Sequence, residues 1–79
     1  MTAGEKYVGV FTEVLGVRPE EAPGLRYQSV PAWDSARHME LVAAIEAAFG
    51  VTLDPDDILE LSSFEVGRRI LSERYGIAF

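Results

Sequence analysis

An aspartate and a serine, Asp34 and Ser35, lie directly before an amphipathic helical run, and the chain's one histidine, His38, follows three residues later. A serine beside a histidine could act as a nucleophile with its base. Serine catalysis also needs a residue that orients the histidine and donors that hold an oxyanion, and the sequence identifies neither. A Gly-x-Ser-x-Gly elbow is absent as well. We therefore do not expect an enzyme, and we expect His38 to be a partly exposed helix residue.

The simplest interpretation of Ser35 is a helix cap, because serine is preferred at helix starts. The start of this helix could both be capped and carry a group covalently attached to the Ser35 hydroxyl. If Asp34 caps the helix, the Ser35 hydroxyl faces water beside the helix N-terminus. A phosphodiester on that hydroxyl would lie in a favourable field, since the helix dipole and free N–H groups favour negative charge.

The composition limits the possible functions. A chain of 79 residues suits a single domain, residues 1–79, with one small core. Thirteen acidic against seven basic residues give a net charge of −6, which disfavours nucleic acid, including a helix-turn-helix DNA site, and anionic membranes. With no cysteine and one histidine, neither a thiolate zinc site nor a two-histidine site can form, so no metal site is expected. Without a signal peptide or spanning segment, we expect a cytoplasmic monomer.

Apolar periodicity and capping residues predict four helices and no strand, so the expected fold is all-α, a small four-helix bundle with a short third helix. The predicted helices cover about residues 2–15, 35–49, 55–61 and 63–75. Thr2 and Glu5 have the spacing of a capping box, as do Ser62 and Glu65. Either Ser62 or Ser63 is expected to cap the last helix. Asp54 precedes a proline in the arrangement of an N-cap. We expect the last helix to fray near residues 75–76.

A long loop, residues 16–34, separates the first two helices. Its three prolines forbid a long helix there, and loops of this length are usually functional or well packed. Four apolar side chains are expected to pin it to the core: Leu25, Tyr27, Val30 and Trp33.

The second helix carries two apolar stripes. One has the spacing of a core face and consists of Leu41, Val42, Ile45 and Phe49. The other consists of Ala36, Met39, Ala43 and Ala47, and Glu40 and Glu46 flank it. Because the first stripe already fills the core position, we interpret the second as a face for partner proteins.

These motifs resemble the acyl carrier proteins. The resemblance rests on Asp34-Ser35, Met39-Glu40-Leu41, Ile45-Glu46 and Phe49-Gly50-Val51, and it extends along nearly all of the chain. It implies that Ser35 bears a covalent 4′-phosphopantetheine arm, which a phosphopantetheinyl transferase moves from coenzyme A with magnesium. It further implies that the arm's thiol holds acyl groups as thioesters for partner biosynthetic enzymes. The chain itself would then catalyse nothing.

Some residues depart from the family pattern. Ala36 stands where the family usually has leucine, Arg37 and His38 add positive character, and Ala47 and Ala48 replace usual acids. Acidic residues gather instead around the third helix. The expected partner-docking residues are Ala36, Arg37, Met39, Glu40, Ala43, Glu46, Asp56 and Asp57.

These departures favour a discrete carrier of specialised, polyketide-type biosynthesis over a fatty-acid carrier. A peptidyl or aminoacyl carrier is an alternative, although the glycine pair usual before its serine motif is absent. The other alternative is an unmodified helical interaction domain in which Ser35 is only a cap.

Overall fold

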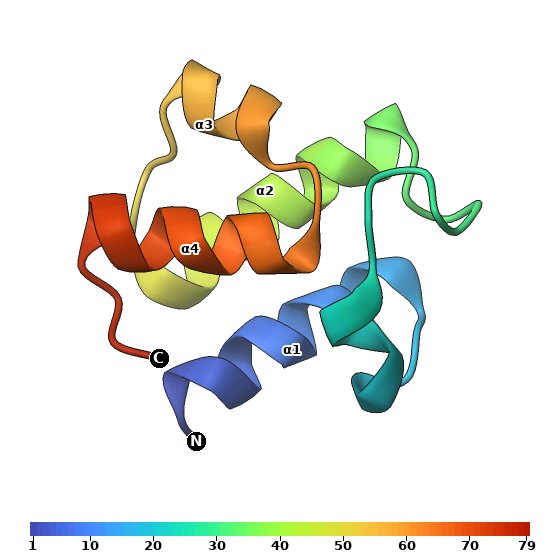
Figure 1. Cartoon of the computed structure of the whole chain (residues 1–79), viewed down its shortest axis with the longest axis horizontal. Coiled ribbons are helices and arrows are strands. Elements are labelled where there is room, and N and C mark those ends of the chain that lie inside the picture. Colours follow the sequence, from blue (N-terminus) through green and yellow to red (C-terminus); the bar gives the residue numbers. More distant parts are fainter.

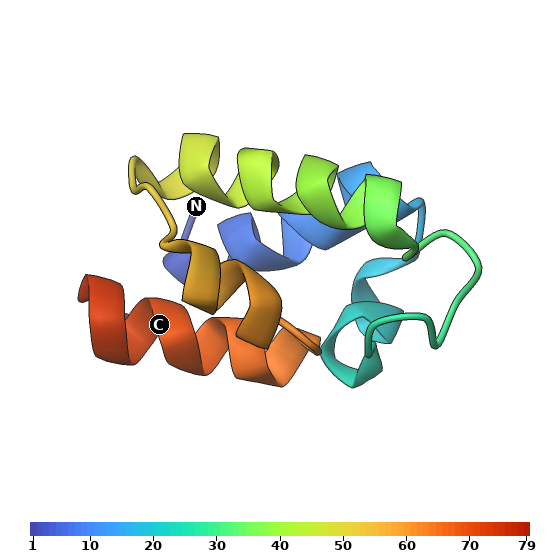
Figure 2. The same cartoon turned by 90° about the horizontal axis from the view of Figure 1, so that it is seen from above.

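The computed structural model describes residues 1–79 and contains four α-helices, as the sequence predicts. They are α1 (Ala3–Leu15), α2 (Ser35–Phe49), α3 (Pro55–Glu60) and α4 (Phe64–Tyr75). Both termini lie at one end of the bundle, and the start of α2 lies with the long loop at the other end (Figures 1 and 2). The predicted all-α class is confirmed, since the sole β-type pairing is an isolated bridge between Arg26 and Ser63. No helix has the length and apolar character needed to cross a membrane.

A cluster of aromatic side chains forms the centre of the core. Tyr7 and Phe11 of α1 contact each other edge to face, with ring centroids 5.0 Å apart, and both contact Phe64 of α4. Trp33 closes the cluster from the loop, 5.5 Å from Phe11, and is fully buried. Such pairs add to the stabilisation that burial alone provides. The long loop is therefore anchored in the core immediately before Asp34.

The predicted core stripe of α2 is largely confirmed. On α2, Leu41, Val42 and Ile45 are buried, and Phe49 is partly buried. On α1 the buried residues are Tyr7, Val10, Phe11 and Leu15, whereas Val8 and Val14 are partly buried. The inner face of α4 is also buried and consists of Phe64, Gly67, Ile70 and Leu71.

The helix ends follow the expected chemistry with two exceptions. The Thr2–Glu5 capping box is present, with reciprocal bonds of 2.9 and 3.1 Å. Of the two serines expected to cap α4, Ser63 is the N-cap, and its hydroxyl accepts from the Val66 N–H, so the Ser62–Glu65 box does not form. Asp54 occupies the N-cap position of α3 without a side-chain capping bond. The last residue of α4 is Tyr75, and Gly76 closes the helix in the left-handed conformation.

The loop before α2 is ordered by short-range structure and by pairing with the α3–α4 connection. It contains a short 3-10 helix, Pro19–Gly24. The N–H of Tyr27 donates to the carbonyl of Ser62 at 2.8 Å, and the N–H of Phe64 donates to the carbonyl of Leu25 at 3.0 Å. Leu25 is buried as expected and Val30 is partly buried, but the Tyr27 side chain is 36% exposed, so its predicted role as a core anchor is wrong.

Candidate functional site

Asp34 and Ser35 have different roles at the start of α2. The Asp34 carboxylate accepts a hydrogen bond from the Arg37 N–H at 2.9 Å, and its carbonyl accepts from the His38 N–H at 2.8 Å. Asp34 is thus the N-cap, and Ser35 is the first helical residue and is exposed. Because the aspartate satisfies the free N–H group, the serine hydroxyl is not needed as the cap. An accessible hydroxyl at the positive end of a four-turn helix fits an attached phosphodiester.

His38 has both ring nitrogens engaged. Its Nδ1 lies 3.0 Å from the indole Nε1 of Trp33, and its Nε2 lies 3.0 Å from the carbonyl oxygen of Ile58. An indole N–H can only donate, so Nδ1 is the acceptor and Nε2 carries the proton that it donates to Ile58. The imidazole is therefore neutral in this arrangement, and neither nitrogen is free to serve Ser35 as a base. The expected positive character at His38 is wrong, although the ring is partly exposed as predicted.

A groove of about 360 Å³ opens beside Ser35. It runs between the loop, α2, α3 and the α3–α4 connection, and its lining consists of Tyr27, Ser35, His38, Met39, Ile58, Leu59, Leu61 and Ser62. Two of these side chains are largely open to solvent, with Met39 53% and Leu59 83% exposed. The groove places an apolar surface next to the exposed hydroxyl, which suits an arm of mixed polar and apolar character.

Several predicted docking residues are exposed. Ala36, Met39 and Ala43 are exposed on α2, as are Glu40 on α2 and Asp56 on α3. Glu46 is only partly exposed, and its carboxylate accepts from the Leu53 N–H at 2.8 Å. It therefore holds the α2–α3 connection, and the structure does not support its expected place among the docking residues.

Asp57 is also wrongly placed among the expected docking residues, because it is buried, with 4% of its surface exposed. Its carboxylate accepts a hydrogen bond from the Tyr75 hydroxyl at 2.5 Å and pairs with the Arg74 guanidinium. The Tyr75 hydrogen bond and the Arg74 charge hold the pKa of the Asp57 carboxyl below its usual range. Asp57 fixes α3 on α4 and is not available to a partner.

Arg37 has an internal role as well as an exposed surface. Its Nη1 donates to the carbonyl of Val14 at 2.9 Å, and its Nε lies 3.3 Å from the Glu40 carboxylate. The carbonyl of Val14 belongs to the last turn of α1, where a cation is favourable. The guanidinium therefore joins the start of α2 to the end of α1, and Glu40 offsets its charge.

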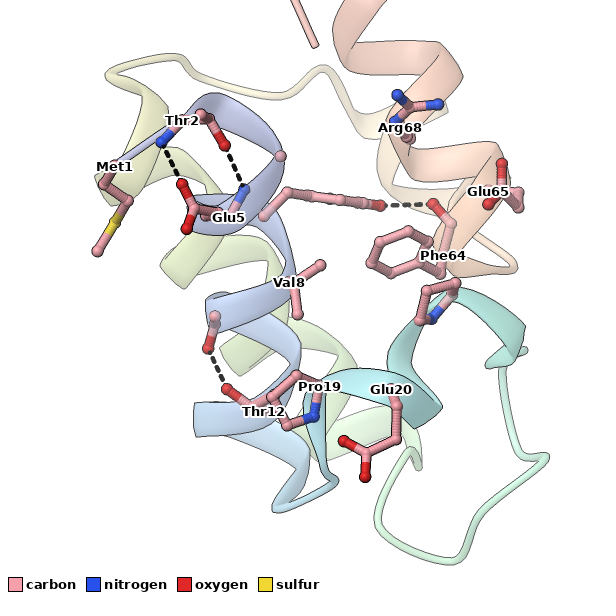
Figure 3. Close-up of a pocket in the computed structure, with 14 residues that line it drawn as sticks. Met1, Thr2, Glu5, Val8, Thr12, Pro19, Glu20, Phe64, Glu65 and Arg68 are labelled. Carbon is pink, nitrogen blue, oxygen red and sulfur yellow. Dashed lines mark hydrogen bonds between the residues drawn. The ribbon is translucent and has the colours of Figure 1, made fainter.

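A second, larger hollow lies away from Ser35. Figure 3 shows it between α1, the 3-10 helix and the start of α4, with a volume of about 920 Å³. The Tyr7 hydroxyl donates to the Phe64 carbonyl at 2.7 Å across it, and burial raises the pKa of Tyr7. Neither Ser35 nor His38 lines this hollow. It is therefore separate from the groove beside the serine.

Sequence reasoning missed five residues that line the groove: Tyr27, Ile58, Leu59, Leu61 and Ser62. Leu59 offered a signal, since it is an apolar residue in a short acidic helix. Trp33 offered another, because a buried indole N–H requires an acceptor, and a histidine lies five residues away. Nothing in the sequence indicated that the carbonyl of Ile58 would complete this arrangement.

Comparison with known families gives one match. A family model described as "Phosphopantetheine attachment site" matches residues 8–65, well over half of the chain, and the matched segment includes Ser35 and most of the groove. The comparisons with curated proteins and with solved structures gave no match. The match and the all-α fold agree with each other. The chain belongs to the phosphopantetheine-attachment family of carrier domains, whose cofactor is covalently bound 4′-phosphopantetheine.

Proposed function

We propose that Ser35 bears the phosphopantetheine arm and that the chain is an acyl carrier protein. In this role it holds acyl intermediates as thioesters and presents them to biosynthetic enzymes. One observation carries the proposal: within the matched segment, Ser35 is exposed at the start of α2 while its neighbour Asp34 caps the helix. The groove beside it gives the arm an apolar surface.

The chemistry at Ser35 is a phosphoryl transfer carried out by a separate phosphopantetheinyl transferase. The serine oxygen forms the new P–O bond to the phosphorus that carries the pantetheine. The P–O bond within the pyrophosphate of coenzyme A breaks, and adenosine 3′,5′-bisphosphate leaves. The hydroxyl proton passes to a base of the transferase, since His38 has no free nitrogen. The bound arm supplies the thiol that this cysteine-free chain lacks. Its own residues expose the serine and bind partner enzymes.

The proposed docking surface consists of Ala36, Met39, Glu40 and Ala43 of α2 with Asp56 and Leu59 of α3. It is exposed, and it combines apolar contact area with carboxylates at its edge. This pattern suits transient binding to several partners that present basic residues, because opposite charges speed encounter while a small apolar area keeps affinity modest.

The first turn of α2 supports a further assignment to a specialised, polyketide-type pathway. Ala36 offers a smaller contact than leucine, and Arg37 places a cation where docking partners approach. Partners must therefore accept a less acidic and less bulky helix start. Loading by a malonyl transferase of fatty-acid synthesis tests this assignment. We expect slow loading of the phosphopantetheine-bearing protein, and efficient loading would contradict the assignment.

Incubation with coenzyme A, magnesium and a broad-specificity phosphopantetheinyl transferase tests the attachment itself. We expect the intact mass to rise by one phosphopantetheine in the unaltered protein and to stay unchanged in Ser35→Ala. Ser62→Ala is the matched control, because Ser62 is an exposed serine that lines the same groove. It should be modified like the unaltered protein.

A further inference from the structure

Three segments that surround Ser35 meet at the ring of His38. Trp33 lies in the loop two residues before Ser35, His38 lies in the first turns of α2, and Ile58 lies in α3. The hydrogen bonds from Trp33 to His38 and from His38 to Ile58 are each 3.0 Å long. Loop, α2 and α3 are therefore joined through one side chain.

The Trp33 indole N–H and the Ile58 carbonyl both depend on His38 for a hydrogen bond. The Trp33 side chain is fully buried, so its indole N–H needs an acceptor within the protein. The carbonyl of Ile58 is one of the last four of α3, which the helix itself leaves without a partner. The neutral imidazole satisfies both groups at once. Arginine or lysine could not, because each lacks an acceptor.

Aromatic contacts fix the orientation of the imidazole. The planes of the His38 and Trp33 rings lie within 17° of each other, as suits a hydrogen bond in the plane of both rings. Tyr27 meets both rings edge-on, with centroids 5.4 Å from His38 and 6.2 Å from Trp33. The ring is thus held by its neighbours as well as by its hydrogen bonds.

These contacts bear directly on the serine. Trp33 and His38 flank the Asp34 cap, so their bond sets the angle at which the loop enters α2. Ile58 and its neighbour Leu59 line the far wall of the groove, so the second bond sets the distance between that wall and Ser35.

We propose that His38, as the neutral tautomer protonated on Nε2, is a positioning residue for the attachment site. It holds Ser35 and the groove in the geometry that the phosphopantetheinyl transferase recognises. This inference rests on the proposed function of Ser35. His38 acts through Trp33 and Ile58 and takes no proton from the serine.

Three variants separate the two hydrogen bonds. His38→Asn places an acceptor near the Nδ1 position and keeps the bond from Trp33. His38→Gln places a donor near the Nε2 position and keeps the bond to Ile58. His38→Ala removes both. We expect kcat/KM for modification of Ser35 to fall about tenfold in His38→Ala, as a small misplacement of a reacting group can cause, and to be partly restored in the other two.

The single tryptophan supplies an independent readout. The ¹H–¹⁵N resonance of the Trp33 indole should move strongly in His38→Ala and His38→Gln and stay near its original position in His38→Asn. Full modification rates in a folded His38→Ala, or an indole resonance that none of the variants moves, would overturn the inference. If His38→Ala does not fold, His38→Asn and His38→Gln test the inference instead. Modification of Ser35 at the rate of the unaltered protein in both variants would overturn it.

A failure of the proposed function of Ser35 can be distinguished from a failure of the inference about His38. An unaltered protein that gains no phosphopantetheine contradicts the role of Ser35. The indole resonance of the unmodified protein then still decides whether Trp33 in the loop donates to His38 in α2.

Discussion

The hydroxyl of Tyr75, the last residue of α4, donates to the buried carboxylate of Asp57 in α3 at 2.5 Å. The same hydroxyl accepts from the Asp54 N–H at 2.9 Å, and Arg74 pairs with the other carboxylate oxygen of Asp57. A helix as short as α3 cannot persist by its own hydrogen bonds, so its position depends on such contacts. Since α3 carries Ile58 and Leu59, this cluster helps to shape the groove beside the serine.

The Asp57 cluster should make stability sensitive to acid. The Tyr75 hydrogen bond and the Arg74 guanidinium lower the pKa of Asp57, so its contribution is complete above the unfolded-state value of about 3.9. It is lost as the pH falls through the lower pKa of the folded state. Chemical denaturation should show a difference in unfolding free energy between the unaltered protein and Asp57→Asn that is constant near neutrality and shrinks below about pH 4.

Asp56→Asn is the matched control for that experiment, because Asp56 is the exposed neighbour of Asp57 in the same turn. Its effect should be small at every pH. A difference between the unaltered protein and Asp57→Asn that stays constant down to the acid transition would contradict the role assigned to the Asp57 carboxylate.

Stability measurements should distinguish the capping residue, Asp34, from the attachment residue, Ser35. Asp34→Ala removes the hydrogen bond to the Arg37 N–H and should cost about 1 kcal/mol of unfolding free energy. Ser35→Ala removes an exposed hydroxyl that does not cap the helix, so its effect should stay within about 0.5 kcal/mol. Thermal or urea unfolding measures both. A larger loss for Ser35→Ala than for Asp34→Ala would show that the serine is the cap.

Gly67 is required by close packing on α4. A Cβ at this position would overlap the Tyr7 hydroxyl and lie 2.5 Å from Cδ1 of Leu61. Gly67→Ala should therefore cost about 1–3 kcal/mol, the usual penalty for overpacking a core. Gly9→Ala on α1 is the control, because nothing lies within 4 Å of its Cβ position, and it should stabilise the helix by about 0.5–1 kcal/mol. Urea unfolding measures the unfolding free energy of Gly67→Ala and Gly9→Ala. Equal changes in the two variants would contradict this explanation.

The exposed apolar side chains should serve binding and not folding. Leu59→Ser and Met39→Ala remove side chains that are 83% and 53% exposed, so the unfolding free energy should change by less than about 0.5 kcal/mol. If these residues contact the transferase, kcat/KM for modification should fall about fivefold in each, the effect of losing roughly 1 kcal/mol of binding. Unchanged kinetics in both variants would remove them from the docking surface.

The sequence predicted most of the fold because its local signals agree with one another. The Thr2–Glu5 box, the glycine after α1 and the proline at the start of α3 each mark a helix end by local chemistry, and all four helices lie where expected. The Ser62–Glu65 box failed because two adjacent serines compete for one cap. Pairing of the loop with the α3–α4 connection places Ser63 at the cap position.

The candidate site was less predictable, because its geometry depends on contacts between distant segments. Asp56 and Asp57 are identical and adjacent in sequence, yet one is exposed and the other buried. The difference arises from Arg74 and Tyr75, which lie more than fifteen residues away and meet Asp57 only in the folded bundle. The hydrogen bond of the His38 Nε2 depends likewise on Ile58, twenty residues further along the chain.

The most direct test of the central claim is to locate the phosphopantetheine on the modified protein. Cleavage after arginine should release residues 27–37, which contain Ser29 and Ser35. Fragmentation of this peptide should place the whole added mass on Ser35, and Ser62→Ala should give the same result. No added mass on the folded protein, or added mass on Ser29 or elsewhere with Ser35 unmodified, would contradict the account.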